Sequence, residues 1–371
     1  METCDVLIVG GGPAGSACAG RLRQAGLDVL ILDRKLFPRD KPCAGWITPQ
    51  VVEELRIDLD DYRQGRVLEP ITGFATAFME GPEVLTKYDE PISYGIRRCE
   101  FDHYLLERSG ARLQLGQGLK VLERRRDMWS VNGEIETPLV IGAGGHFCPV
   151  ARHLGARPGN GELAVAAQEI EFEMSPEQLR ACPIPRGIPF IYFCDDLKGY
   201  GWYYRKGDYL NVGLGREDDQ NIAGHVTRFC ESLEKRGKIP RGIAQRFAGH
   251  AYLLYEHAPR RMIADGVLLI GDAAGVAYGR SGEGIRPAVE SGLLAAAVVT
   301  NAAGRYRQAD LEPYLARLTA RLGKKNSRSL LDRAPFGLKR YLAGKLMVRP
   351  WFARHIMVDR WFLHRHEPAL V

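Results

Sequence analysis

Three glycines and an aspartate near the amino terminus have the residue types and spacing that bind a nucleotide. Gly10, Gly12 and Gly15 follow an apolar run that begins at Val6, and Asp33 lies 23 residues after Gly10. Gly10 permits a tight turn, Gly12 removes a side chain that would hold a pyrophosphate away, and Gly15 lets a helix pack close to a strand. Because an acid at this distance accepts a hydrogen bond from a ribose hydroxyl, the pattern predicts a dinucleotide site.

The elements that must position these residues are visible on either side of the glycines. The apolar run before Gly10 predicts a strand, the small residues from Ala14 to Leu22 predict a helix, and Val29–Asp33 predicts a second strand. The first N–H groups of such a helix are free and lie at the positive end of its dipole, so they would receive the phosphates.

A second group of residues with chemical potential is aromatic. Tyr200, Trp202 and Tyr204 alternate, so on a strand all three side chains project from one face. This run is predicted to form a hairpin with residues 209–214 across 206–208. The face is either a wall for a flat or polyunsaturated ligand or an ordinary sheet core packed against a helix. We favour the wall, because buried Trp and Tyr need polar partners and usually lie at pocket edges.

The chain has 371 residues, a length that indicates two domains. The pattern of predicted strands and helices changes twice along it. Widely spaced strands occupy about 161–255, and residues 266–275 return to the strand, glycine turn and helix of the opening. We therefore expect an α/β fold in which a Rossmann-type nucleotide-binding domain is interrupted by a β-sheet substrate domain and followed by a helical tail. The predicted segments are 1–66, 97–158 and 256–313 for the first domain, 67–96 and 159–255 for the second, and 314–371 for the tail.

Composition and cysteine usage exclude several classes of protein. With 45% hydrophobic and 26% charged residues, the chain has an ordinary globular composition. We see no signal peptide at its start and no run of about eighteen apolar residues that would span a membrane. Eight cysteines without a CxxC pair or Cys/His metal spacing predict reduced thiols, no metal site and a cytoplasmic protein.

The positive charge is concentrated in the tail. From Arg317 to Val371 there are 13 Lys or Arg against 3 Asp or Glu, a local +10 within a chain of +6. Breaks at Pro335 and Pro350 predict three short helices that mix these cations with large apolar residues. The helices either meet an anionic lipid surface, as a peripheral membrane contact, or cap the body with their apolar faces. No recognition motif accompanies the charge, so we expect no nucleic-acid partner.

Longer motifs resemble a known family. Residues 1–315 resemble the FAD-binding fold of para-hydroxybenzoate-hydroxylase-type flavoproteins in the order and spacing of the first glycine turn, Gly142-Ala143-Gly144-Gly145, and Gly271-Asp272-Ala273-Ala274-Gly275 with Gly282-Glu283-Gly284-Ile285-Arg286. Within that superfamily the chain resembles the geranylgeranyl reductase family in two shorter motifs, Lys41-Pro42-Cys43-Ala44-Gly45 and Tyr200-Gly201-Trp202-Tyr203-Tyr204.

The resemblance implies an FAD cofactor and a set of residues that hold it. Asp272 would accept hydrogen bonds from the ribityl chain. Amides of the turn at 281–285 would stabilise the negative charge that collects on the pyrimidine end of the reduced flavin. Arg98 resembles the arginine that lies against the cofactor in this fold. The cofactor-binding residues so predicted are Gly10, Gly12, Pro13, Ala14, Gly15, Asp33, Arg34, Cys43, Ala44, Gly45, Arg98, Asp272, Gly282, Gly284 and Ile285.

The resemblance also implies catalytic and substrate residues. In the reductases a cysteine at the position of Cys43 faces the flavin ring, where a thiol would protonate a carbon as hydride arrives from N5. The alternative is a small buried side chain that fills a tight loop. Two positions depart from the family: Gly144 stands where an aspartate is common, and Tyr204-Arg205 stands where Phe-Pro is usual. Arg205 either binds an anionic group of the substrate or lies in solvent on the hairpin. The predicted catalytic residues are Cys43, Tyr200 and Trp202, and the predicted substrate residues are Tyr200, Trp202, Tyr204 and Arg205.

The implied activity is reduction of C=C bonds in a hydrophobic substrate, such as an isoprenoid or polyene, by hydride transfer from the reduced flavin. One alternative is an FAD-dependent monooxygenase that hydroxylates an aromatic or polyketide substrate. Another is a protein that binds flavin or lipid without turnover. No second glycine motif is framed by a strand and a helix, so an external donor, with NAD(P)H as the candidate, would reduce the flavin without a dedicated domain. The sequence predicts no particular oligomeric state.

Overall fold

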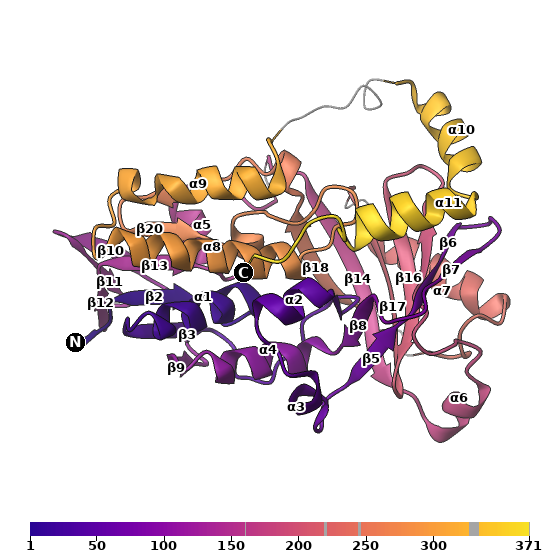
Figure 1. Ribbon diagram of the computed structural model, residues 1–371, viewed down its shortest axis with the longest axis horizontal. Helices are drawn as coiled ribbons and strands as arrows, with labels where there is room; N and C mark the ends of the chain where they lie inside the picture. The colour runs from indigo at the N-terminus through magenta and orange to yellow at the C-terminus, as the bar shows by residue number, and fades with distance from the viewer. Residues whose placement is uncertain (160, 219–220, 244–245, 326–333, 371) are drawn as a thin grey trace.

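A computed structural model describes residues 1–371 except 160, 219–220, 244–245, 326–333 and 371 (Figure 1). Its six-stranded sheet has the order β19-β20-β13-β2-β3-β9 and is parallel except where β19 meets β20. All residues of β2 and β3 are buried, which explains why both are uninterrupted apolar runs. The six strands are β2 (Val6–Val9), β3 (Val29–Asp33), β9 (Arg112–Leu115), β13 (Leu139–Gly142), β19 (Ile263–Ala264) and β20 (Val267–Leu269).

Helices and a smaller sheet enclose this first sheet. Helix α1 follows β2 and packs against α8, and small residues such as Ala14, Cys18 and Ala295 allow the two helices to approach closely. A four-stranded sheet in the order β1-β12-β11-β10 adds Trp129 and Val131 to the same core. The elements are α1 (Pro13–Gln24), α4 (Arg98–Arg108), α5 (Pro149–His153), α8 (Ile285–Ala302), α9 (Gln308–Leu322), β1 (Glu2–Thr3), β10 (Leu122–Arg125), β11 (Met128–Val131) and β12 (Ile135–Thr137).

A seven-stranded sheet, in the order β18-β14-β17-β16-β15-β6-β7, lies beside the first (Figure 1). It is antiparallel except for the parallel pair β6 and β15. One face packs on α7 (Ile222–Lys235) through Val226 and Phe229. We call it the substrate sheet. Its strands are β6 (Gly73–Phe78), β7 (Val84–Lys87), β14 (Ala164–Glu173), β15 (Phe190–Phe193), β16 (Gly199–Lys206), β17 (Tyr209–Arg216) and β18 (Ala248–Leu253).

A three-stranded sheet, in the order β4-β8-β5, connects the two larger sheets. Strand β4 (Trp46–Ile47) follows the predicted flavin-binding turn at 43–45, and β8 (Ser93–Ile96) leads into α4. Trp46 packs against Phe74 and Tyr204 of the substrate sheet, with ring centroids 5.9 and 6.0 Å away. The turn is therefore anchored to both sheets. The remaining short elements are β5 (Leu68–Ile71), α2 (Pro49–Glu54), α3 (Leu59–Arg63), α6 (Pro176–Ala181) and two 3₁₀ turns, Tyr255–His257 and Gly271–Ala273.

The C-terminal region has two parts. The first, which we call the arm, is residues 336–352 and contains α10 (Phe336–Leu346) and α11 (Pro350–Phe352). The second, which we call the strap, is residues 353–370 and begins with the π-helical segment Ala353–Phe362. In Figure 1 the arm stands over the end of the substrate sheet, and the strap runs back across the body toward α8.

The structure confirms the predicted α/β class, with a Rossmann-type sheet and a separate β-sheet unit. The predicted hairpin is confirmed as well, because β16 pairs antiparallel with β17. Helix α10 begins directly after Pro335 and α11 begins at Pro350, so both predicted breaks fall where helices start. Of the helices that the structure describes, none is long and apolar enough to cross a bilayer.

Candidate active site

The glycine turn between β2 and α1 has the geometry of an anion cradle. A Cβ on Gly15 would overlap the carbonyl oxygen of Gly10, so the helix and the turn approach each other in a way that only glycine allows. A Cβ on Gly12, in contrast, would meet only Arg39, at 3.5 Å. Among the described residues no side chain caps α1, and Pro13 and Ala14 form its first turn. The first amides are thus available to a phosphate.

Asp33 lies at the end of β3, where the predicted ribose acid should be. Its Oδ2 accepts the backbone N–H of Gly11 over 2.8 Å, and its Oδ1 accepts that of Lys35 over 2.9 Å. The side chain is therefore fixed beside the glycine turn, and each oxygen keeps a lone pair for a hydroxyl. The neighbouring Arg34 is exposed.

Asp272 lies in a half-buried cluster of charged and polar side chains. His250 Nε2 is 3.4 Å from Asp272 Oδ2, and Lys41 Nζ is 2.8 Å from the same His250 nitrogen. Burial acts to raise the pKa of Asp272, but the hydrogen bond from His250 and the charge of Lys41 lower it below its usual range. Burial lowers the pKa of Lys41 to about 8 against the attraction of Asp272. Asp272 is thus held as a carboxylate, the form that accepts bonds from hydroxyls.

The predicted pyrimidine-binding turn precedes α8, which begins at Ile285 with Gly284 as its N-cap. Gly282 has φ +65°, and a Cβ there would overlap the hydroxyl of Tyr252. The Glu283 carboxyl accepts the backbone N–H of Arg286 over 2.8 Å and interacts with that of Ile285. Two of the helix-terminal amides are therefore occupied by Glu283, a residue that the prediction did not include.

Cys43 lies at the junction of the two sheets. Its side chain is half-buried. Two residues later, Gly45 has φ +70°, and a Cβ at this position would overlap the carbonyl oxygen of Ile96. Arg98 is buried beside Cys43 and binds Asp102 through two hydrogen bonds of 2.7 and 2.8 Å. Burial acts to lower the pKa of Arg98, but Asp102, with a smaller contribution from Cys43, raises it above its usual value. A fixed cation thus lies next to the thiol.

The aromatic face of β16 meets both predicted flavin-side turns. Tyr200 Oη donates to the carbonyl of Ser281, just before the pyrimidine-binding turn. Tyr204 Oη donates to the carbonyls of Ala44 and Gly45, each over 2.6 Å. The alternation of the sequence therefore places these side chains on one face, and that face bridges the two turns.

Arg205 does not join the aromatic face. It follows Tyr204 on β16, so its side chain projects from the opposite side of the sheet. Its Nε donates to the carbonyl of Gly207 over 2.7 Å, and its guanidinium lies 3.6 Å from Asp208. The prediction of a substrate-binding Arg205 is therefore not matched by its placement; it braces the hairpin turn.

Sequence reasoning missed several buried polar residues of this site. The alternation of β16 could have found Lys206, which is fully buried and donates to the carbonyls of Ala44 (3.1 Å) and Ile96 (2.9 Å). His250, Glu169 and Asn211 come from other strands of the substrate sheet and carry no local signal. They contact the segment that contains Lys41 and Cys43 only because the folded chain brings distant strands together.

The strap closes one side of the aromatic face. Phe362 is 1% exposed, and its ring centroid lies 5.4 Å from that of Tyr200 and 6.2 Å from that of Phe193. Of the two alternatives for the tail, packing on the body is thus what the structure has for residues 353–370.

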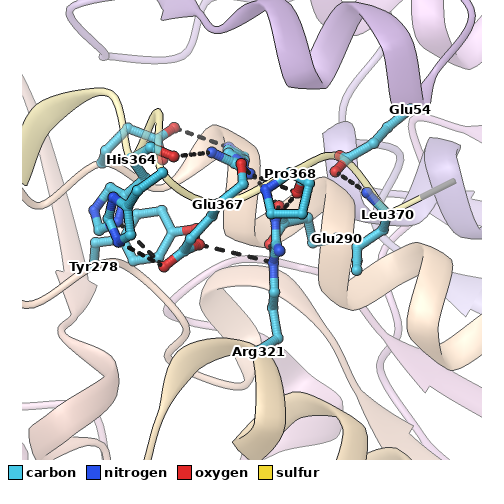
Figure 2. Close-up of polar contacts among 11 residues, drawn as sticks. Glu54, Tyr278, Glu290, Arg321, His364, Glu367, Pro368 and Leu370 are labelled. Atoms are coloured by element: carbon cyan, nitrogen blue, oxygen red, sulfur yellow. Dashed lines mark hydrogen bonds and ion pairs between the residues drawn. The ribbon is translucent and has the colours of Figure 1, made fainter. Parts of the chain in front are cut away.

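A clamp of charged side chains holds the end of the strap on α8. Arg286 is fully buried and donates to the carbonyls of His364, Glu367 and Pro368 over 3.0, 2.8 and 3.1 Å. Figure 2 shows the second half of the clamp, where Arg321 and Glu290 lie beside Pro368 and Leu370 donates to Glu54 over 2.8 Å. The last residues are therefore held through their backbone as well as their side chains.

Comparison with known proteins first defines the class. Residues 3–89 match the model of the family described as FAD binding domain. A geranylgeranyl bacteriochlorophyll reductase-like protein from Thermoplasma acidophilum superposes with a TM-score of 0.73 at 20% identity, covering 94% of this chain and 88% of that one. A flavin-dependent brominase superposes with a TM-score of 0.71 at 16% identity, covering 98% and 97%. The chain therefore has the fold of FAD-dependent oxidoreductases of the para-hydroxybenzoate-hydroxylase type.

Closer relatives in sequence define the family. The menaquinone reductase of Mycobacterium tuberculosis (strain ATCC 25618 / H37Rv) is 30% identical over 332 residues, which cover 80% of this chain and 76% of the relative. The chloroplastic geranylgeranyl diphosphate reductase of Oryza sativa subsp. japonica is 32% identical over 347 residues, which cover 84% and 70%. The chain belongs to the geranylgeranyl reductase family of FAD-dependent oxidoreductases.

The residues present fit FAD. The open side of Gly12 and the uncapped start of α1 suit a pyrophosphate, and the fixed carboxylate of Asp33 suits a ribose. Asp272 is a half-buried carboxylate whose neighbours keep it ionised, which suits a chain of hydroxyls. The pyrophosphate, the ribose and the ribityl chain thus each have a chemically matched partner.

Proposed function

We propose that this chain reduces carbon–carbon double bonds of a hydrophobic, isoprenoid-type substrate. The observation that carries the proposal is the meeting of the β16 aromatic face with the Cys43 turn and with the turn before α8. The proposal is supported by this contact, because the predicted flavin-side turns, one of which carries the Cys43 thiol, both bond to the aromatic face of β16. The names of the relatives, reductases of geranylgeranyl diphosphate and menaquinone, support the same class of substrate.

The chain's own residues would divide the work as follows. The glycine turn and Asp33 would bind the adenosine half of FAD, and Asp272 would bind the ribityl chain. Bound and reduced, FAD supplies a hydride. Cys43 would hold the proton that the second carbon receives, and Arg98 beside it would stabilise the thiolate that remains. Tyr200, Trp202 and Phe362 would orient the apolar chain and exclude water.

Stopped-flow absorbance of the anaerobically reduced protein tests this function. Mixing with a geranylgeranylated lipid or with menaquinone should reoxidise the flavin, whereas Cys43→Ser should slow that step by about 10²- to 10⁴-fold while FAD content is unchanged. Cys99→Ser, a half-buried cysteine on α4, is the matched control. Fast reoxidation by oxygen with a hydroxylated product would instead establish the monooxygenase, and no reaction with either would favour a flavin or lipid carrier.

The electron donor belongs to the same proposal. We infer that an external donor reaches the flavin from solution, with NAD(P)H as the candidate, because the sequence contains no second glycine motif framed by a strand and a helix. Anaerobic titration with NADH, NADPH and dithionite separates the cases. Bleaching by dithionite alone would exclude both nicotinamides and point to a protein donor.

We further propose that the arm brings the protein to a membrane surface. Large apolar side chains of the arm face solvent, with Trp351 65%, Tyr341 62% and Phe336 55% exposed. The arm also contains four cations and no acid, and Arg340 and Arg349 line a groove of about 660 Å³ between α10 and α11. Aromatic residues beside cations suit an anionic bilayer surface.

Co-sedimentation with vesicles tests the membrane proposal. Binding to vesicles that contain phosphatidylglycerol should exceed binding to pure phosphatidylcholine and should weaken in high salt, because the cations contribute through screened attraction. Equal and weak binding to both vesicles would overturn the proposal without affecting the reductase.

A further inference from the structure

Two buried polar side chains of the substrate sheet contact the backbone of Cys43. Asn211, on β17, donates from Nδ2 to the Cys43 carbonyl over 3.3 Å. On the neighbouring strand β14, the carboxyl group of Glu169 interacts with the Cys43 backbone N–H. Asn211 is 0% exposed and Glu169 is 6% exposed. The substrate sheet therefore holds the Cys43 carbonyl by a hydrogen bond and places a buried carboxyl group near the Cys43 N–H.

The same pair also holds a predicted substrate residue. Asn211 Oδ1 accepts the indole N–H of Trp202 over 2.7 Å, and Asn211 Nδ2 lies 3.4 Å from Glu169 Oε2. A Cβ on Gly213 would overlap the Trp202 ring and the Glu169 side chain. Glycine at this position therefore leaves room for both side chains. The side-chain amide of Asn211 thus bonds to both Trp202 and the Cys43 backbone and links their positions.

Charged groups face Glu169 from several elements. Lys206 on β16 and Glu171 on β14 form an ion pair beside it, and Arg98 of α4 lies beyond it at Cys43. Burial raises the pKa of Glu169 to about 7, against the attraction of Lys206 and the bond from the Cys43 amide. Glu169 therefore changes its ionisation near neutral pH, and its carboxylate form is the stronger acceptor.

We propose that Glu169 and Asn211 are positioning residues that hold the Cys43 turn, and hence its thiol, at the reacting face of the site. The proposal rests on the proposed function for the role of Cys43. Neither residue needs to touch a reacting atom, because they act through the backbone of Cys43 and through Trp202.

Alkylation of Cys43 in the FAD-loaded protein tests the proposal. The rate with iodoacetamide is followed by peptide mass mapping between about pH 5.5 and pH 8.5 in wild type, Glu169→Gln and Asn211→Leu. Glu169→Gln and Asn211→Leu should each change the Cys43 rate by about three- to tenfold, because each loosens the turn that presents the thiol. The inflection near pH 7 should disappear in Glu169→Gln. Glu173→Gln, an exposed residue of the same strand, is the matched control.

Rates and pH profiles that agree with wild type within twofold in both variants would overturn the proposal. Where FAD shields the thiol from the reagent, hydrogen exchange at the Cys43 amide makes the same comparison: faster exchange in both variants supports the proposal and unchanged exchange overturns it. Neither measurement uses a substrate. A flavin that fails to react with unsaturated lipid would therefore refute the proposed function while leaving this answer intact.

Discussion

The arm and the strap adjoin in sequence and mix the same kinds of residue, yet they lie in opposite environments. In the described part of the arm, six large apolar side chains are exposed, from 36% for Val348 to 65% for Trp351. In the strap, Val358, Phe362 and Leu363 are at most 1% exposed. Hydrophobic content alone therefore does not decide which segment is buried.

Partners in the body decide it. The strap offers backbone carbonyls to Arg286 and a ring to Tyr200, and its Asp359 accepts a hydrogen bond from Tyr88 over 2.8 Å. The arm touches the body mainly through Met347 and a contact of Arg340 with Asp195. The difference teaches that two adjoining segments of similar composition are buried or exposed according to the partners that the body offers them.

Removal of Arg286 should separate the strap from the body most strongly. Arg286→Ala removes one of the two arginines that pair with Glu290, leaving Arg321, and deprives three strap carbonyls of a buried donor. We expect the free energy of unfolding to fall by about 4 kcal/mol, as for a broken buried ion pair. Urea denaturation measures this loss, and Arg305→Ala, an exposed pair with Asp310, should change stability by less than about 0.5 kcal/mol. A loss below about 1 kcal/mol from Arg286→Ala would show that the clamp is not what holds the strap.

Truncation of Phe362 should be the next largest effect. Phe362→Ala removes a ring that is 1% exposed and packed against Tyr200, Phe193 and Trp46. We expect a loss of about 3 kcal/mol in the free energy of unfolding. Trp351→Ala on the arm is the matched control and should cost less than about 0.5 kcal/mol. Similar losses from the two substitutions would remove the distinction between strap and arm.

The first sheet and the hairpin were predictable because their signals are local. Gly10, Gly12, Gly15 and Asp33 act within one strand, turn and helix, and the alternation of β16 fixes which side chains share a face. A resemblance to a family added Cys43 and Asp272, which no local pattern identifies.

The rest of the site depends on contacts between distant segments. Glu169 and Asn211 are ordinary strand residues until the substrate sheet packs against the Cys43 turn. The sequence did not decide whether the strap packs on the body or meets a membrane, because its basic and aromatic residues suit both environments. The buried guanidinium of Arg286, 78 residues before His364, and the packing of Phe362 on Tyr200 resolve that choice for the strap. Arg205 was left open as well, and its bonds to Gly207 and Asp208 agree with the alternative in which it lies on the hairpin.

A smaller effect should come from Glu54, the acceptor of the strap's Leu370 amide. Burial, together with the charge of Glu290, raises the pKa of Glu54 to about 7 from an ordinary 4.5. The folded state therefore holds this proton more tightly than the unfolded state, so stability falls as pH rises from about 4.5 to 7. Wild type should lose on the order of 1 kcal/mol more than Glu54→Gln across that window in urea denaturation. Parallel curves for the two proteins would mean that Glu54 does not couple the strap to pH.

Substitutions in the arm should have the smallest effect on the free energy of unfolding and the largest effect on membrane binding. Phe336→Ser with Trp351→Ser removes two exposed side chains, so the free energy of unfolding should change by less than about 0.5 kcal/mol. Binding to phosphatidylglycerol vesicles should fall at least about tenfold, since each inserted aromatic side chain contributes through buried apolar area. Reoxidation of the flavin by a detergent-dispersed substrate should be unchanged, because the arm leaves Cys43 and the strap untouched. If the double variant lowers stability as much as Phe362→Ala, the arm is part of the core and the comparison fails.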